Sequence, residues 1–155
     1  MRARFILYVR DQRRGAEFYA AVLATSPQLN VPSMTEFVLP GGSVLGLMPE
    51  TGMVSLLGPV LPDPRLANGV PRSELYLVVQ EALPFIVRAT TLGARMLSPL
   101  QHRDWGHSAG YFLDRDGQVL AFAEQLPDLG SQGLTAPRWP SAEPRSRPCH
   151  LVPSS

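Results

Sequence analysis

Residues 109–124 show the clearest pattern of apolar and polar positions in the chain. Side chains alternate with a period of two along Ala109–Asp114 and again along Gln118–Glu124, which is typical of β-strands. The Asp114–Gly117 segment predicts a tight turn, because aspartate side chains bond nearby backbone amides and glycine accepts a positive φ. The sequence therefore predicts a β-hairpin, entered through a loop that carries Trp105.

A β-α-β-β-β order is predicted for the first half of the chain. Asp11 is a good helix N-cap, and the residues after it place apolar side chains at helical spacing. Pro40-Gly41-Gly42 predicts a turn between two strands. The predicted elements are a buried strand Arg4–Val9, a helix Gln12–Leu23, an edge strand or loop Gln28–Met34, a strand Thr35–Leu39 and a strand Ser43–Met48.

The same order of elements recurs in the second half, which indicates an internal duplication. Leu7 and Val9 of the first strand correspond to Leu77 and Val79 of the strand that begins the second half. The predicted elements before the hairpin are a strand Glu74–Val79, a helix Glu81–Leu92 and a strand Arg95–Leu100.

Two segments fall outside this repeat. The Thr51–Arg72 connection is rich in Pro and Gly but also apolar, so we expect it to pack on the other half or on a second subunit. Residues 127–155 are rich in Pro, Ser and Arg without any apolar period, which predicts a disordered tail. We therefore expect one domain over 1–126, with half-modules of about 1–50 and 73–126 joined by 51–72.

Composition narrows the possible classes of protein. The 155 residues are 45% hydrophobic and carry a formal net charge of +1, which allows a full core and gives no reason to expect nucleic-acid binding. Cys149 is the only cysteine, so no disulfide forms within the chain. We expect a cytoplasmic protein without a membrane partner, because no signal peptide is recognisable and no apolar run approaches the roughly 18 residues of a membrane span.

The motifs YVRD followed by FY, and WGHSAGYFLDRDG in the second half, resemble the vicinal oxygen chelate superfamily. That superfamily includes glyoxalase I, extradiol dioxygenases, fosfomycin-resistance enzymes and bleomycin-resistance proteins. The resemblance covers about Arg4–Gln125. It implies an α+β fold in which two paired β-α-β-β-β modules form a curved sheet around a cleft, often between the subunits of a dimer.

The resemblance also implies four metal-ligand positions, which fall on Arg4, Gly46, Glu74 and Ala121 in this sequence. A guanidinium does not ligate a metal, and glycine and alanine have no side-chain donor. One carboxylate does not hold a divalent cation, so we predict no metal and no cofactor. A sequence without these metal ligands is most similar in character to the bleomycin-resistance branch of the superfamily.

The two histidines that precede the hairpin, His102 and His107, are interpreted as loop residues that lie off the cleft strands. Arg4 and Glu74 either grip a polar ligand or form a salt bridge between the halves. Trp105 either stacks on a planar ligand or closes the end of a sheet.

Three hypotheses about function follow. The first is that the chain binds a small organic molecule, such as an antibiotic or a metabolite, in a metal-free cleft and as a homodimer. Its interface would be the Thr51–Arg72 connection and the hairpin edge. The alternatives are a metal-dependent glyoxalase-like lyase, isomerase or dioxygenase, and a non-catalytic interaction domain. The small residues Gly46 and Ala121 leave room for a pocket in the cleft. The predicted ligand-binding residues are Trp105, Glu74, Arg4, Tyr111, Gly46 and Ala121, with no catalytic residue.

Overall fold

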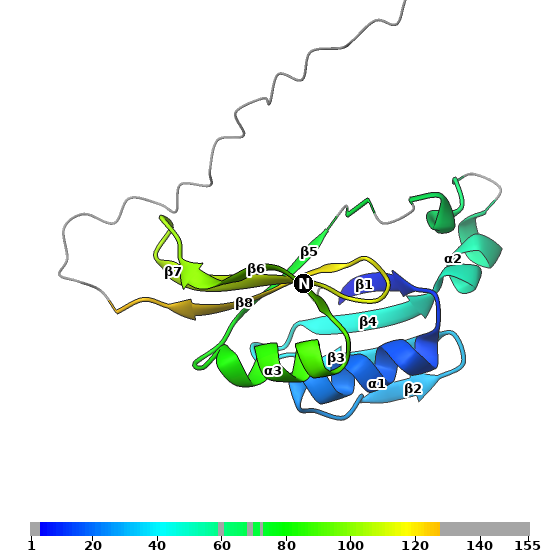
Figure 1. Cartoon of the computed structure of the whole chain (residues 1–155). Helices are drawn as coiled ribbons and strands as arrows, with labels where there is room; N and C mark the ends of the chain where they lie inside the picture. Colours follow the sequence, from blue (N-terminus) through cyan, green and yellow to red (C-terminus); the bar gives the residue numbers. More distant parts are fainter. Residues whose placement is uncertain (1–3, 59–60, 68–69, 72, 128–155) are drawn as a thin grey trace, which may run out of the picture.

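Two four-stranded mixed sheets and three α-helices make up the part of the chain that the computed structural model describes, residues 4–58, 61–67, 70–71 and 73–127 (Figure 1). Sheet A contains, in spatial order, β1 (Arg4–Val9), β4 (Val44–Pro49), β3 (Met34–Val38) and β2 (Leu29–Val31). Sheet B contains β5 (Glu74–Val78), β8 (Val119–Gln125), β7 (His107–Leu113) and β6 (Arg95–His102). The helices are α1 (Gln12–Leu23), α2 (Glu50–Leu57) and α3 (Leu83–Thr91), with a 3₁₀ turn η1 (Pro64–Ala67).

Both sheets have the same topology. The first strand of each half lies parallel to the last strand, and the remaining pairs are antiparallel. A crossover helix, α1 or α3, makes each parallel pairing possible, because parallel neighbours need a long connection. This arrangement confirms the predicted α+β fold of two β-α-β-β-β halves.

Helix α1 begins, and the β7–β8 hairpin turns, where local sequence signals predict. The Asp11 side chain accepts a hydrogen bond from the Arg14 backbone amide at 3.0 Å, which caps α1. At the hairpin turn, Asp114 Oδ1 accepts hydrogen bonds from the backbone amides of Asp116 at 2.9 Å and Gln118 at 2.8 Å. Gly117 has a φ of 87°, so the expected positive φ is confirmed.

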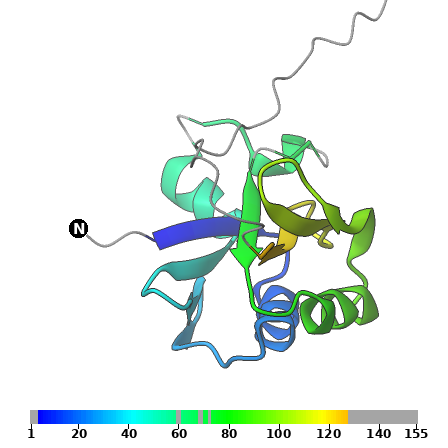
Figure 2. The same cartoon turned by 90° about the vertical axis from the view of Figure 1, so that its left-hand side faces the viewer.

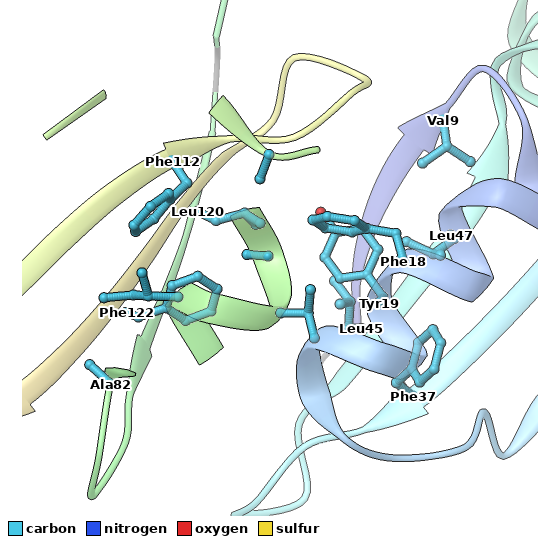
Figure 3. Close-up of a cluster of buried hydrophobic side chains, with 14 residues drawn as sticks. Val9, Phe18, Tyr19, Phe37, Leu45, Leu47, Ala82, Phe112, Leu120 and Phe122 are labelled. Carbon is cyan, nitrogen blue, oxygen red and sulfur yellow. The ribbon is translucent and has the colours of Figure 1, made fainter. Parts of the chain in front are cut away.

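One hydrophobic core joins the two halves. Figure 2 shows α1 and α3 side by side, and these helices are in contact. Figure 3 shows Phe112 and Phe122 of sheet B and Phe18 and Leu45 of the first half in the same cluster. Burial of these apolar side chains stabilises the fold, at roughly 1.5–3 kcal/mol for each large residue.

The prediction that Arg4–Val9 forms a buried strand was wrong, because most of β1 is exposed. Only Val9 at its end is buried, whereas Phe5 is 61% exposed and Ile6 40% exposed. Strand β1 is the edge of sheet A and pairs with β4 alone within the described residues, so one of its edges has no covering strand. An apolar run alone does not distinguish this position from a central one.

The connection between the halves is packed rather than solvated, and its helix lies against the first half. Helix α2 begins directly after β4, contacts β4 and β1, and buries Met53. The sequence predicted no helix here. No helix of the described part is long and apolar enough to cross a membrane. The predicted tail lies outside the described residues, apart from Pro127.

Candidate ligand-binding site

The face of sheet B opposite the core carries aromatic side chains from two strands. Leu75 and Leu77 of β5 pack against the core, so Tyr76 between them points to the opposite face. Tyr76 of β5 and Tyr111 of β7 are both in register with Ala121 of β8, which lies between them. Their ring centroids are 6.5 Å apart. The Ala121 side chain between the two rings is small, which lets the rings approach each other.

A hydrogen-bonded chain extends this aromatic pair. Trp105 Nε1 donates a hydrogen bond to the Tyr76 hydroxyl at 3.1 Å, and that hydroxyl lies 2.8 Å from His107 Nδ1. The Tyr76 hydroxyl therefore accepts from Trp105, and the direction of its bond with His107 depends on the tautomer of the imidazole ring. The rings of Tyr76 and His107 also stack, with centroids 5.8 Å apart.

Arg103 provides a fixed positive charge beside Tyr111. Its guanidinium carbon lies 5.1 Å from the Tyr111 ring centroid, within the range of a cation–π contact. Arg103 also donates hydrogen bonds to the Ala109 carbonyl at 2.9 Å and to Ser98 Oγ at 2.8 Å. These bonds hold the guanidinium in one position over the ring.

Glu74 provides a negative charge to the same surface. Burial raises the pKa of the Glu74 carboxyl. Burial also raises the pKa of Tyr111, and the charge of Glu74 raises it further. The two side chains are therefore close enough to interact electrostatically. We use the name sheet B cluster for Glu74, Tyr76, Arg103, Trp105, His107 and Tyr111.

The structure brings together half of the predicted ligand-binding residues. Trp105, Glu74 and Tyr111 belong to the sheet B cluster, and the fully buried Ala121 lies beneath it. Arg4 belongs to sheet A. Its Nε lies 3.1 Å from Glu36 Oε1, so the salt bridge that the structure shows for Arg4 is within sheet A rather than with Glu74.

Gly46 does not open a pocket, which corrects the expectation from its size. A Cβ added there would lie 3.2 Å from Ile6 Cγ1 and 3.4 Å from Met34 Sδ. These two side chains therefore already fill the space above the glycine. Ala121 is 0% exposed and offers no free volume either.

Sequence reasoning missed three members of the cluster, Tyr76, Arg103 and His107. His107 is the first residue of β7 and contacts β5, and His102 is the last residue of β6, so the assignment of both histidines to a loop was wrong. The available signal for Tyr76 was strand alternation, which places it two residues after Glu74 on the same face.

Comparisons with known proteins identify the fold. No protein-family model matches the sequence, and no curated protein matches it. A glyoxalase-related enzyme from Fulvimarina pelagi is similar in structure with a TM-score of 0.68, at 22% identity over 88% of this chain and 99% of that chain. A glyoxalase/bleomycin resistance protein/dioxygenase from Nocardioides has a TM-score of 0.63 at 20% identity, over 88% of this chain and 89% of that chain. This chain has the glyoxalase/bleomycin-resistance fold.

A third solved structure supports the same conclusion about the fold. A glyoxalase/bleomycin resistance protein/dioxygenase family enzyme from Burkholderia phytofirmans PsJN has a TM-score of 0.64 at 15% identity. The alignment covers 79% of this chain and 97% of that chain. At these identities the likeness is one of fold.

The metal-ligand positions expected for a glyoxalase/bleomycin-resistance fold do not fit a metal ion in this chain. Arg4 is paired with Glu36, Gly46 is covered by side chains, and Ala121 has no donor atom. Glu74 is the single carboxylate of the four positions. Within the described residues, no three His, Cys, Asp or Glu side chains gather closely enough to hold a metal ion. The donor set therefore gives no basis for a metal-dependent reaction step.

Proposed function

We propose that this chain binds a small organic molecule at the sheet B cluster and that the site uses no metal. The observation that carries the proposal is the hydrogen-bonded group of Trp105, Tyr76 and His107 on the outward face of the sheet. Aromatic walls with a few convergent polar groups are typical of small-molecule sites. The glyoxalase/bleomycin-resistance fold of the similar structures is consistent with such a site.

The cluster chemistry favours a planar ligand with polar substituents. The partly exposed Trp105 ring provides a stacking surface, and Tyr111 provides a second ring beside it. Glu74 accepts hydrogen bonds, whereas Arg103 donates them. Ligands of this kind include metabolites and antibiotics with a planar core.

Titration with three naphthalene derivatives tests this proposal. We expect 2-naphthol, 2-naphthylamine or 2-naphthoate to bind wild-type protein in isothermal titration calorimetry. Tyr76→Phe keeps the ring but removes the hydroxyl that joins Trp105 to His107. We expect it to weaken binding about twofold to tenfold, the equivalent of one hydrogen bond.

The matched control is Tyr8→Phe on sheet A, which removes a hydroxyl that is not part of the cluster. It should leave the affinity for the naphthalene derivatives unchanged. Equal effects of the two variants, or no binding of any of the three compounds, would contradict the proposal.

We further propose that the protein is a homodimer. Strands β1 and β5 each have one strand neighbour among the described residues, and Phe5 and Val78 on them are 61% and 54% exposed. Exposed apolar side chains on unpaired edges are typical of association sites. Sedimentation equilibrium should give twice the 16.9 kDa chain mass. A monomer mass over the whole accessible concentration range would contradict this.

A further inference from the structure

A cavity of about 440 Å³ lies between strand β1, the α2–η1 connection and the β7–β8 turn. None of the sheet B cluster residues lines it. Its volume falls within the range of about 300–1,000 Å³ that small-molecule pockets occupy. It is therefore large enough for a ligand of its own.

The walls of this cavity are largely apolar. Ile6 of β1 and Met53 of α2 contribute from the first half, and Leu66 and Val70 contribute from the connection. Leu66 is 74% exposed and Val70 is 63% exposed, although both are aliphatic. A ligand with an apolar body would remove these side chains from water, which is favourable.

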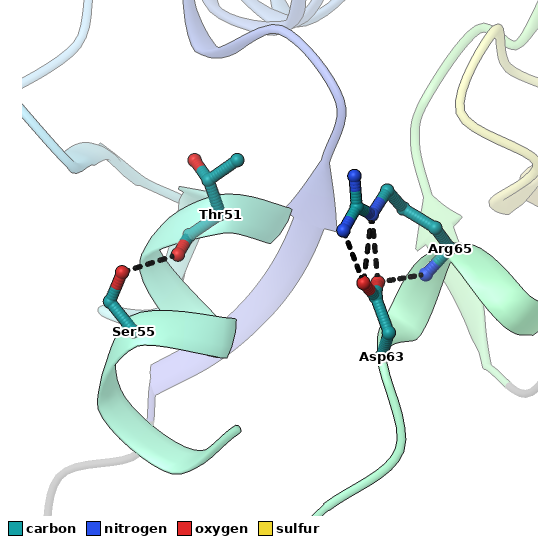
Figure 4. Close-up of polar contacts among 4 residues, drawn as sticks. All are labelled: Thr51, Ser55, Asp63 and Arg65. Carbon is teal, nitrogen blue, oxygen red and sulfur yellow. Dashed lines mark hydrogen bonds and ion pairs between the residues drawn. The ribbon is translucent and has the colours of Figure 1, made fainter. Parts of the chain in front are cut away.

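Three carboxylates and two guanidinium groups line the same cavity. Asp63 is occupied by Arg65, which donates to both of its carboxylate oxygens (Figure 4). Asp116 Oδ1 accepts a hydrogen bond from the Arg10 backbone amide at 3.0 Å. With the Asp63–Arg65 pair neutral, Glu50 and Asp116 face the single charge of Arg10, so the cavity has a net negative charge.

Glu50 differs from the other two carboxylates of the cavity in its lack of a directly bonded partner among the described residues. Within the described residues it accepts no hydrogen bond and forms no salt bridge, unlike Asp63 and Asp116. Burial raises the pKa of Glu50, and the nearby Arg10 guanidinium only partly offsets this effect. A cation beside the carboxylate would stabilise its ionised form.

We propose that this cavity is a second binding site, for an amphipathic organic cation. The ammonium group of the ligand pairs with Glu50, and its apolar body contacts Ile6, Leu66 and Val70. The proposal is independent of ligand binding at the sheet B cluster, because the two sites share no residue.

Three probes with the same apolar body and different charges test this site. We would titrate the full chain with 3-phenylpropylamine, 3-phenylpropan-1-ol and 3-phenylpropanoate by isothermal titration calorimetry. The amine should bind about tenfold more tightly than the alcohol, because hydrogen bonds to charged groups are stronger than neutral ones. Glu50→Gln should reduce the affinity for the amine to that for the alcohol, and Leu66→Ala should weaken both.

Two matched variants test whether the amine binds in this cavity rather than elsewhere on the protein. Glu17→Gln removes an exposed carboxylate on α1 that pairs with Arg13 and does not line the cavity, so it should leave the amine affinity unchanged. Tyr76→Phe, in the sheet B cluster, should also leave it unchanged. Thermal unfolding of Glu50→Gln checks that the variant is folded.

Four outcomes would overturn the proposal. They are an unchanged amine affinity in folded Glu50→Gln, tighter binding of the anionic probe than of the amine, loss of amine binding in Tyr76→Phe, and no binding of any probe at millimolar concentration.

Discussion

Asp114 serves two structural purposes through its two carboxylate oxygens. Oδ1 accepts the backbone amides that form the hairpin turn, and Oδ2 accepts the buried Tyr19 hydroxyl of α1 at 2.8 Å. The Tyr19 bond joins residues 95 positions apart, so one side chain fixes both a local turn and the contact between the halves. Sequence reasoning predicted the turn, because it depends on neighbours in the chain. The Tyr19 contact depends on packing.

Burial of Asp114 should make stability depend on pH. Burial raises the pKa of this carboxyl above its ordinary value of 3.8, so the folded state binds its proton more tightly than the unfolded state. The resulting stabilisation is complete below pH 3.8 and is lost as the pH rises through the folded-state pKa. Asp114→Asn removes this titration. We expect the wild-type free energy of unfolding, minus that of Asp114→Asn, to fall between acid and neutral pH.

Urea denaturation of both proteins from about pH 3 to about pH 7 measures this difference. Carboxylates that do not interact with Asp114 titrate alike in both proteins and cancel in the subtraction. A difference that stays constant, or that increases with pH, would contradict the account of Asp114.

Tyr76 and His107 show why half of the candidate site was not predictable. The sequence separates them by 31 positions, and they meet only because β5 and β7 lie on either side of β8. Trp105, Glu74 and Tyr111 were predicted from residue type and from a family resemblance. The hydrogen bonds that join Trp105, Tyr76 and His107 depend on strand register, which is not visible in one sequence.

At the scale of elements, helix α2 is the main feature that the sequence did not indicate. Its residues are apolar on most sides, and Gly52 lies in its first turn. Glycine is among the poorest helix formers, which obscured the helical pattern. Strand ends and the α1 cap were predictable, because they depend on local hydrogen bonds and on turn residues.

Gly52→Ala should stabilise the protein. A Cβ at this position would lie 3.5 Å from Met48 Cγ, an ordinary van der Waals contact, so the methyl group fits. The substitution removes backbone freedom from the unfolded chain, and we expect a gain of about 0.5–1 kcal/mol in the free energy of unfolding. Thermal and urea denaturation measure it.

Gly117→Ala is the matched comparison for this prediction. Gly117 has a φ of 87°, which an L-residue with a Cβ rarely adopts, so the same change should destabilise the hairpin turn. The account of α2 fails if Gly52→Ala lowers stability as Gly117→Ala does.

At the scale of the whole molecule, the duplicated order of elements was the most informative signal. Both halves repeat a strand, a helix and three strands, and the sequence alone indicated this. The exposure of β1 was not predictable, because an apolar strand at a sheet edge has the same pattern as one at the centre. Tertiary position, rather than local sequence, decides which apolar residues are covered.

Divalent metals should not stabilise this protein. Ni²⁺, Zn²⁺, Mn²⁺ and Fe²⁺ need several His, Cys or carboxylate ligands, and Mg²⁺ binds through carboxylates and water, whereas the expected positions provide Glu74 alone. A metal that binds only the folded state raises stability by about 2.7 kcal/mol at one hundred times its dissociation constant. We therefore expect no shift in thermal unfolding and no stoichiometric metal in elemental analysis. A clear shift with near-stoichiometric metal would instead favour a metalloenzyme.

The most direct test of ligand binding at the sheet B cluster is the NMR signal of the Trp105 indole N–H, which donates to Tyr76. Comparison with Trp139→Phe assigns the two tryptophan signals of the chain. Titration with the naphthalene derivatives should shift the Trp105 signal saturably. If a derivative binds while the Trp105 signal stays in place, the ligand lies elsewhere and the central proposal is wrong.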